Sequence, residues 1–321
     1  MQTIFVTGAE GYAGSLFTQQ LRHRGYTVIA GVRNRARKLQ YERQSGKALV
    51  CDVSDAINVA RAIASARPDA LVHLAGAAHT WSASNQPLDA YQSIVSAWAN
   101  VLDAVRRFCP RARVLLVSAG DVYGHAGREG QPLPESTVPQ PATTFGSLKL
   151  AAESIARTYF DKFHLNLTIA RPFHYTGPRQ PDSFFFGWVA KRLAEWNLAT
   201  QGEELSLPDL SCRRDVLHIQ DVLDAYERLL VDGKPNEIYN VCSGVARPCR
   251  EIVESMAQAA RLSLRLVEAP APSNDEVVPA LCGDNTKLRT ELGWQPTHTL
   301  DGAVRELVQS HQRQPAAQQP T

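Results

Sequence analysis

The stretch that decides the fold is IFVTGAEGYAG, residues 4–14, in which a short apolar run leads into three glycines. Gly8, Gly11 and Gly14 are spaced by three residues, rather than in the more familiar Gly-x-Gly-x-x-Gly order. They allow a tight turn, a close approach of the backbone to a ligand and close packing of the next helix. The amino terminus of that helix would offer free N–H groups to a pyrophosphate. We expect a dinucleotide site here, with a plain glycine turn as the alternative, and assign to it Thr7, Gly8, Gly11, Tyr12, Ala13 and Gly14.

Apolar runs of similar length recur along the first half of the chain, separated by amphipathic segments. The runs are continuous rather than alternating, as in strands that are buried on both faces of a parallel sheet. The sequence therefore predicts a doubly wound α/β fold, whose ligands bind at the carboxyl ends of the strands. Strands are expected at 4–8, 27–32, 48–53, 70–76, 113–120 and 165–172, and helices at 14–23, 56–67, 90–107 and 146–160.

The composition of the sequence changes after Arg171, because residues 172–187 contain several prolines and glycines. Fewer strands are expected beyond this point, although the run 237–243 is expected to return to the main sheet, and helices are expected at 188–199, 220–231 and 248–261. We interpret this part as a smaller, mixed substrate domain of residues 172–215 and 244–309. The nucleotide-binding domain would comprise residues 1–171 and about 216–243, and the polar residues 310–321 would form a disordered tail.

The composition is typical of a soluble globular protein. The chain has 321 residues, a net charge of +2 and 44% hydrophobic residues. A charge so close to zero argues against a broad electrostatic grip on nucleic acid. No apolar stretch reaches the ~18 residues that cross a bilayer, so no membrane contact is expected. The six cysteines show neither a Cys-x-x-Cys pair nor zinc-ligand spacing, so we expect no metal site and reduced thiols in a cytoplasmic protein.

The residues after the second expected strand bear on the choice of cofactor. NAD-binding sheets usually carry an acidic residue there for the ribose 2′-hydroxyl, whereas this chain has Arg33 and Arg35. Guanidinium groups suit a 2′-phosphate, so we expect NADP(H) rather than NAD(H); the alternative is a solvated basic loop. At the ends of the third and fourth strands, we expect cofactor contacts from Asp52, Val53, Leu74, Ala75 and Gly76.

Motifs along nearly the whole chain resemble those of the extended short-chain dehydrogenase/reductase family, the NAD-dependent epimerase/dehydratase group. Within it, the chain is most similar to the reductases of GDP-4-keto-6-deoxymannose. The resemblance places Pro172 and Phe173 at the cofactor and implies a homodimer built on helices 90–107 and 146–160. The motifs are TGAEGYAG (7–14), CDVSD (51–55), LVHLAGAA (71–78), VSAGDVYG (117–124), FGSLKLAAES (145–154), ARPFHYTGPRQ (170–180), RRDVLHIQDVLDAY (213–226), YNVCSG (239–244) and GDNTKLRTELGW (283–294).

The resemblance implies a particular reaction. In such reductases, hydride from the nicotinamide reaches C4 of a nucleotide-linked keto sugar. A Tyr donates the proton, a Lys four residues later holds the ribose, and a Ser or Thr after the fifth strand hydrogen-bonds the carbonyl oxygen. The spacing of four residues puts the Tyr and the Lys on one face of a helix.

This chain departs from that pattern at three positions. Phe145 stands where the Tyr is expected, Ala119 where the Ser or Thr is expected, and Ile94 where the family usually has Asn, whereas Lys149 is kept. A positioned general acid contributes typically 10²–10⁴ in rate, so ordinary reductase activity should be small without one. Ala119 and Phe145 each lack only a hydroxyl group, as they would if an experimenter had removed it from an active parent. Ile94 is not such a change and favours natural divergence. Both origins stay open.

A neighbouring side chain could replace the missing acid. Alternation along the strand should turn Ser118 to the other face of the sheet. Asp121, Tyr123, His174 and Tyr175 lie in segments that line the family's pocket. Because the family usually has Asn-His at positions 174–175, the His174–Tyr175 pair is our preferred replacement; packing or substrate contact is the alternative.

The resemblance also implies the contacts to substrate, a GDP- or dTDP-linked hexose. Arg214 matches an Arg that contacts the pyrophosphate of the sugar nucleotide, and Ser183 belongs to a segment that closes over the nucleotide. We therefore expect substrate contacts from Ser118, His174, Ser183, Arg214 and Asn240, and catalytic positions at Ala119, Asp121, Phe145 and Lys149.

Three functions are compatible with these residues. The first is an NADP(H)-dependent reductase of a nucleotide-linked 4-keto-6-deoxyhexose, with impaired or altered activity. The second is a catalytically silent sensor or scaffold that binds NADP(H) and a sugar nucleotide, which Phe145 and Ala119 favour. The third is a sugar-nucleotide epimerase or dehydratase, which would also need the absent Tyr.

Overall fold

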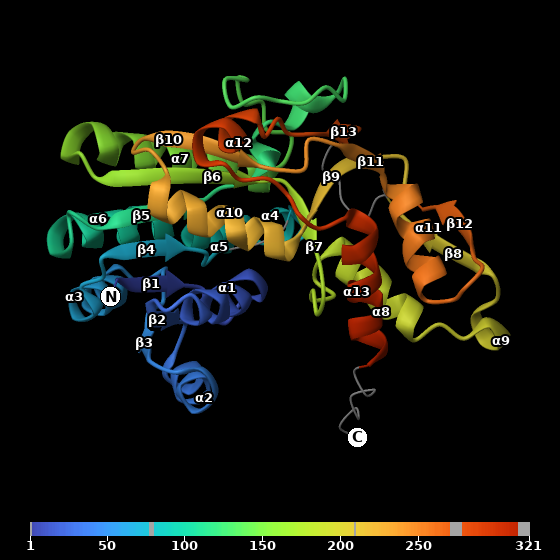
Figure 1. The fold of residues 1–321 in the computed structure, drawn as a ribbon, viewed down its shortest axis with the longest axis horizontal. Coiled ribbons are helices and arrows are strands. Elements are labelled where there is room, and N and C mark those ends of the chain that lie inside the picture. Colours follow the sequence, from blue (N-terminus) through green and yellow to red (C-terminus); the bar gives the residue numbers. More distant parts are fainter. Residues whose placement is uncertain (1, 77–79, 209, 270–277, 314–321) are drawn as a thin grey trace.

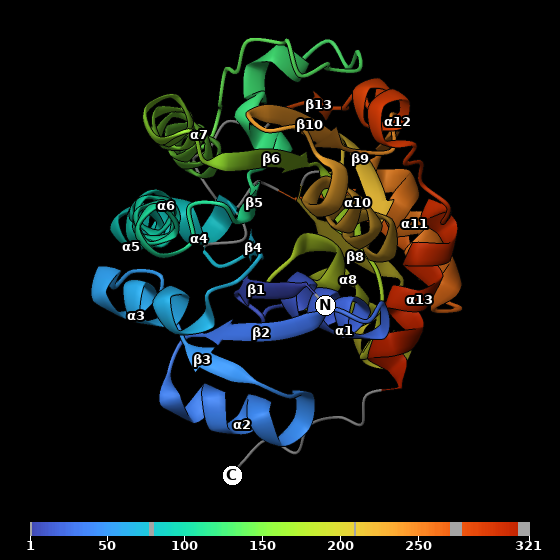
Figure 2. The same cartoon turned by 60° about the vertical axis from the view of Figure 1, so that its left-hand side comes forward.

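A seven-stranded parallel sheet forms the larger part of the structure, a computed structural model that describes residues 2–76, 80–208, 210–269 and 278–313. The strand order is β10-β6-β5-β4-β1-β2-β3, so it reverses direction between β1 and β4 (Figures 1 and 2). Ligands of such sheets bind at that crevice. The strands are β1 (Thr3–Thr7), β2 (Thr27–Val32), β3 (Ala48–Val50), β4 (Ala70–His73), β5 (Arg113–Val117), β6 (Asn166–Pro172) and β10 (Glu237–Val241).

Helices cover both faces of this sheet, and a separate apolar core lies under each layer (Figure 2). The first face is covered by α3 (Ala56–Ala66), α6 (Ala97–Phe108) and α7 (Thr144–Phe163). The second face is covered by α1 (Tyr12–His23), α10 (Ile219–Asp232) and α12 (Thr286–Leu292), with α2 (Arg35–Ser45) beside β3. The predicted doubly wound α/β fold is confirmed.

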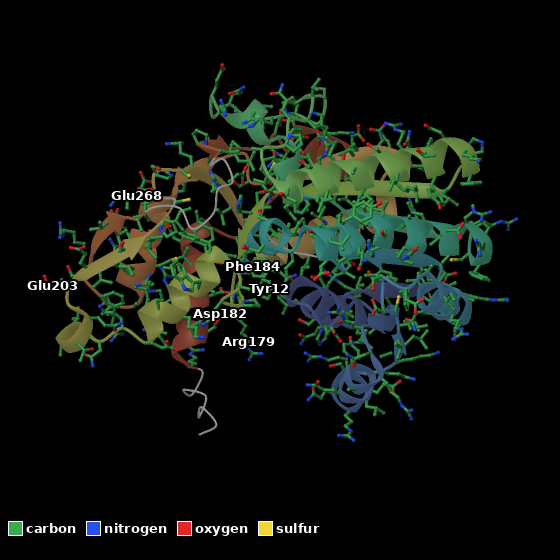
Figure 3. The ribbon with its side chains drawn as sticks, turned by 180° about the vertical axis from the view of Figure 1, so that it is seen from behind. Tyr12, Arg179, Asp182, Phe184, Glu203 and Glu268 are labelled. Atoms are coloured by element: carbon green, nitrogen blue, oxygen red, sulfur yellow. The ribbon has the colours of Figure 1, made fainter. Side chains whose placement is uncertain are left out.

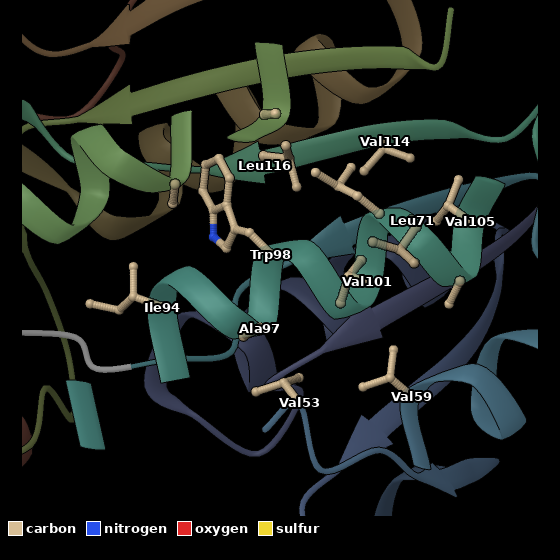
Figure 4. Close-up of a cluster of buried hydrophobic side chains, with 14 of the residues drawn as sticks. Val53, Val59, Leu71, Ile94, Ala97, Trp98, Val101, Val105, Val114 and Leu116 are labelled. Carbon is tan, nitrogen blue, oxygen red and sulfur yellow. The ribbon is translucent and has the colours of Figure 1, made fainter. Parts of the chain in front are cut away.

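The helix α6 illustrates how the sequence produces this layering. Trp98, Val101, Leu102 and Val105 recur at the spacing of one helix face, and all four are fully buried against the sheet (Figure 4). Each such side chain contributes roughly 1.5–3 kcal/mol by leaving water. The chain reaches α6 through α4 (Thr80–Asn85), α5 (Pro87–Tyr91) and a π-helical turn, Gln92–Ser96.

The smaller part of the molecule holds two further sheets and its own apolar core (Figure 1). One sheet contains β7 (His174–Thr176), β9 (Arg213–His218), β11 (Ala246–Pro248) and β13 (Ala280–Leu281), and the other pairs β8 (Glu204–Leu207) with β12 (Arg265–Glu268). Around them lie α8 (Phe185–Ala194), α9 (Leu198–Gln201), α11 (Cys249–Ala259) and α13 (Leu300–Gln312).

Some expectations about this second half were wrong in detail. Among the described residues, the smaller part has six short strands, more than the sequence pattern suggested, because two to six residues are too few to show a clear period. The expected helix at 188–199 is instead α8 and α9, separated at 195–197. Residues 310–312, expected in a disordered tail, form the end of α13, where Ser310 accepts a hydrogen bond from Arg179 N at 2.8 Å. Residues 314–321 of that tail lie outside the described residues. In the described part of the chain, no helix is long and apolar enough to cross a membrane.

Candidate active site

The carboxyl ends of β1, β2, β4 and β5 border a cavity of about 960 Å³ that extends to the smaller part of the molecule. The structure brings most of the predicted site residues together around it. From the cofactor prediction, the cavity is lined by Gly8, Gly11, Tyr12, Ala13, Gly14, Arg33, Asp52, Val53, Leu74, Ala75, Gly76, Lys149, Pro172 and Phe173. From the catalytic and substrate predictions, it is lined by Ser118, Ala119, Asp121, Phe145, His174, Ser183 and Arg214.

The glycine loop has the geometry of a phosphate cradle. Gly8 has a φ of +68°, and a Cβ there would lie 2.7 Å from Ala75 N. A Cβ on Gly14 would lie 2.1 Å from the Gly8 carbonyl oxygen, so only glycine lets α1 begin this close to β1. Thr7 is fully buried and supports the loop instead of lining the cavity, since its Oγ1 lies 2.7 Å from His73 Nδ1 and accepts a hydrogen bond from Ala75 N.

The two arginines after β2 occupy different environments. Arg33 lines the cavity, whereas Arg35 is the exposed first residue of α2 and lies outside the cavity lining. Asn34 between them caps that helix by accepting a hydrogen bond from Arg37 N at 3.0 Å. Of these two arginines, Arg33 is therefore the one whose guanidinium can reach a ligand in the cavity.

Lys149 is held in the cavity wall by the start of α7. Thr143 caps the helix by accepting a hydrogen bond from Gly146 N, and a Cβ on Gly146 would lie 2.5 Å from Asp121 O, so the helix packs directly on the turn after β5. Lys149 Nζ then donates to Val117 O at 2.8 Å. Burial lowers the pKa of this amine to about 8, although Glu153 and Asp121 favour its charged form.

The three positions that depart from the family pattern are all apolar, and two of them, Ala119 and Phe145, line the cavity wall together with Lys149. Ile94, Ala119 and Phe145 are buried in the same core cluster, and Figure 4 shows Ile94 beside α6. The Phe145 ring centroid lies 5.6 Å from Lys149 Nζ. Ile94 sits in the π-helical turn 92–96, a local irregularity often found at functional sites. Where a reductase would present polar groups, this chain extends its hydrophobic core.

A buried polar network lies behind that wall. Ser118 Oγ donates to Glu153 at 2.5 Å, and Glu153 accepts two hydrogen bonds from the Arg171 guanidinium. Arg171 also donates to the Tyr123 hydroxyl, which donates to Asn240 Oδ1 at 2.8 Å. The contact with Glu153 does not turn Ser118 to the opposite face of the sheet as expected, because Glu153 lies on α7, in the layer whose core also contains Ala119. Asn240, expected to contact the substrate, is fully buried and lies outside the cavity lining.

The sequence interpretation missed the pair Glu153 and Arg171. Both side chains are almost fully buried, with Nη2 and Oε2 separated by 2.6 Å. Their signal was present, since each charge directly follows a run of apolar residues, Leu-Ala-Ala (150–152) before Glu153 and Ile-Ala (169–170) before Arg171. Buried charges are rare unless they are paired. Other cavity residues that the sequence did not indicate are Gln86, Asp89, Gln92, Thr143 and Gln180.

The far wall of the cavity is aromatic. Tyr12 stacks on Tyr175 with ring centroids 6.4 Å apart, and it also contacts Phe184 (Figure 3). Burial raises the pKa of Tyr175 to about 12 and raises the pKa of Tyr12 still further, so both hydroxyls stay protonated. Tyr12 follows the glycine loop and Phe184 precedes α8, so this contact joins the two parts of the molecule.

The charged groups at the substrate end are His174, Asp121 and Arg214. Burial lowers the pKa of His174 to about 4; Asp121 favours its protonated form and Arg214 opposes it. Arg214 donates to two backbone carbonyls, of Arg213 and Val278, which leaves part of its guanidinium for a ligand. Within the described residues, no cluster of three His, Cys, Asp or Glu side chains is placed to hold a metal ion, and the six cysteines are free thiols.

Comparison with known proteins places this architecture in a family. The family model described as GDP-mannose 4,6 dehydratase matches residues 5–307. The chain belongs to this family. It is 33% identical over 241 residues to the GDP-6-deoxy-D-mannose reductase of Pseudomonas aeruginosa, which covers 75% of this chain and 79% of that protein. It is 28% identical over 319 residues to the dTDP-6-deoxy-L-talose 4-dehydrogenase (NAD(P)(+)) of Kitasatospora kifunensis, which covers 98% and 97% of the two chains.

Solved structures agree with this assignment. RMD from Pseudomonas aeruginosa in complex with NADPH superposes with a TM-score of 0.84 at 28% identity, covering 97% of this chain and 99% of that one. The UDP-glucose 4-epimerase of Thermus thermophilus in complex with NAD superposes with a TM-score of 0.86 at 24% identity, over 97% and 99% of the chains, and shows the shared fold alone. The resemblance to the short-chain dehydrogenase/reductase group is confirmed.

Proposed function

We propose that the chain binds NADP(H) and a nucleotide-linked 4-keto-6-deoxyhexose in the cavity, and that it reduces the sugar ketone weakly or by an altered route. The observation that carries this proposal is that the glycine loop, Lys149 and Arg214 line one continuous cavity. The ligand classes are supported by a relative named as a GDP-6-deoxy-D-mannose reductase, by one named as a dTDP-6-deoxy-L-talose 4-dehydrogenase (NAD(P)(+)), and by a structure solved with NADPH.

The residues of the cavity fit such a cofactor. The glycine loop has no Cβ at Gly8 or Gly14, so its backbone N–H groups are open to the pyrophosphate. Arg33 would face the 2′-phosphate. Lys149 would bind the nicotinamide ribose from the opposite wall. When bound, NADPH supplies the hydride.

At the substrate end, Arg214 would bind the diphosphate of the sugar nucleotide. Ala119 and Phe145 exclude water from the carbonyl of the sugar without offering it a proton.

The second candidate function is a silent binder of the same two ligands, a sensor or scaffold. It is favoured because Ile94, Ala119 and Phe145 belong to the hydrophobic core and offer no polar group for catalysis. Without a donor at position 145, the reaction would lose roughly 10²–10⁴ in rate. The silent binder predicts that cofactor and sugar nucleotide bind together with no turnover.

A single-turnover assay tests both functions. The unaltered chain, Phe145→Tyr and Ala119→Ser/Phe145→Tyr are each mixed with stoichiometric NADPH and GDP-4-keto-6-deoxymannose. NADPH fluorescence reports binding, and absorbance at the nicotinamide band reports oxidation. We expect slow turnover by the unaltered chain and a rate at least about 10²-fold higher in the two variants, because both regain the phenol as an acid.

The outcomes separate the hypotheses. Turnover by the two variants alone identifies the unaltered chain as the silent binder. If NADPH binds but none of the three proteins reacts, the keto-sugar assignment is wrong. Lack of NADPH binding by all three would overturn the cofactor assignment.

A further inference from the structure

His174 is held at the cavity with an unsatisfied ring nitrogen. Its Nδ1 is shielded from solvent and has no hydrogen-bond partner among the residues that the structure describes. A buried polar atom without a partner destabilises the fold, so its presence calls for an explanation. The backbone cannot easily relieve this cost, because β7 pairs with β9 from His174↔Val216 to Thr176↔His218.

Two charged side chains act on this ring from neighbouring elements. Asp121, on the turn after β5, stabilises the imidazolium, and Arg214, on β9, destabilises it. Lys149 lines the same cavity, and Asp121 also acts on its amine. The Asp121 carboxylate therefore favours the protonated forms of both Lys149 and His174.

We propose that His174, assisted by Asp121, is the catalytic residue that donates the proton to the reduced sugar, in place of the hydroxyl that Phe145 lacks. The inference rests on the proposed reductase function. The carbonyl carbon accepts the hydride that the cofactor supplies, and the carbonyl π pair moves onto oxygen. That oxygen takes the imidazolium proton, NADP⁺ is left, and the neutral imidazole recovers a proton from solvent.

Substrate binding prepares this donor. In the empty cavity, burial and Arg214 keep the imidazole unprotonated near neutral pH, since they lower its pKa to about 4. A diphosphate bound to Arg214 would offset the guanidinium charge and bring two negative charges to the site, which favours the imidazolium. The sugar nucleotide would thus bind together with a proton.

The first experiment measures that proton. Isothermal titration of the NADP⁺-saturated chain with GDP-mannose at about pH 6, in buffers of different ionisation heat, gives the protons taken up per ligand bound. We expect uptake of several tenths of a proton by the unaltered chain and by the control variant His23→Gln, which changes an exposed histidine outside the cavity lining. His174→Gln should bind GDP-mannose without proton uptake. Equal uptake by His174→Gln would overturn the inference.

The second experiment measures single turnover with GDP-4-keto-6-deoxymannose. His174→Gln should slow NADPH oxidation by about 10²-fold or more, and Phe145→Tyr in that background should restore it, which a structural role of His174 does not predict. The rate of the unaltered chain should fall as pH rises, because the imidazolium loses its proton. The rate of Phe145→Tyr/His174→Gln should persist to higher pH, because a free Tyr has a pKa of about 10.

The results distinguish this inference from the proposed function. The acid role is wrong if His174→Gln reacts as fast as the unaltered chain. It is also wrong if Phe145→Tyr alone is fast but Phe145→Tyr/His174→Gln is not, or if the unaltered chain binds both ligands without turnover. Failure of the unaltered chain to bind NADPH or GDP-mannose would instead overturn the proposed function.

Discussion

Lys149 is the residue at which stability and the proposed chemistry oppose each other. Lys149 is almost fully buried, and its amine donates a hydrogen bond to Val117 O. Burial lowers its pKa from 10.5 to about 8. A lysine with a lowered pKa destabilises the fold at every pH below about 8, where both the folded and unfolded chains carry the proton. This penalty disappears as pH rises from about 8 to 10.5, because the unfolded chain alone then keeps the proton.

The substitution Lys149→Met should therefore stabilise the protein at pH 7, by about 1–3 kcal/mol after the loss of the Val117 hydrogen bond. Urea unfolding followed by circular dichroism measures the difference. Its signature is pH dependence, since the advantage of Met should shrink between pH 8 and 10.5. Lys191→Met, which removes an exposed pair with Asp182, is the control and should leave the stability nearly unchanged at every pH in this range. A constant advantage of Lys149→Met across this pH range would contradict the prediction.

At the scale of elements, the start of α1 depends on close backbone contact. A Cβ on Gly14 would lie 2.1 Å from Gly8 O and 3.0 Å from Ala9 Cα. In Gly14→Ala the first turn of the helix must therefore move away from the loop, at a cost of about 1–3 kcal/mol.

If the displaced cradle loses about 1.4 kcal/mol of binding energy, the Kd for NADPH rises about tenfold. Fluorescence titration of Gly14→Ala should show at least this loss. Ser15→Ala, on the same turn but with an exposed side chain, should bind NADPH as the unaltered chain does. Equal affinity of Gly14→Ala and the unaltered chain would show that the loop does not hold the pyrophosphate.

Elements with long or strongly patterned sequences were predictable, and those fixed by distant partners were not. The buried strands β1, β2 and β5 carry continuous apolar runs, and the glycines of residues 8–14 indicate a tight turn by their spacing alone. By contrast, β13 has two residues and pairs with β9, which lies more than 60 residues earlier in the chain. No local pattern encodes such a pairing.

The candidate site shows the same division. The sequence motifs indicated Lys149, Asp121 and His174 as site residues, and all three line one cavity in the structure. They also suggested Asn240 as a substrate contact, although this amide is used by Tyr123 and by the backbone of Leu133. A motif predicts where a residue lies in the fold, but the residues packed around it decide which groups its side chain contacts.

At the scale of the whole molecule, the course of the chain links its two parts. The chain leaves the large sheet after β6, returns at α10 and β10, leaves again at β11, returns at α12 and ends in α13 (Figure 1). Neither part is a continuous segment, so we expect them to unfold together. Thermal unfolding followed by far-ultraviolet circular dichroism and by tryptophan fluorescence should give coincident transitions, since Trp98 reports one part and Trp188 the other. Two separated transitions would show that the parts are independent.

This interwoven course also limits how such a protein can acquire a new substrate. A single exchange of genetic material at position 172 would combine a cofactor-binding half with a foreign α10 and β10, and would place unmatched side chains in the core beneath the sheet. Three separate segments would have to be inherited together to transfer the smaller part intact. Small changes along the cavity wall, such as those at positions 119, 145 and 174, are the easier route by which new chemistry can arise on this scaffold.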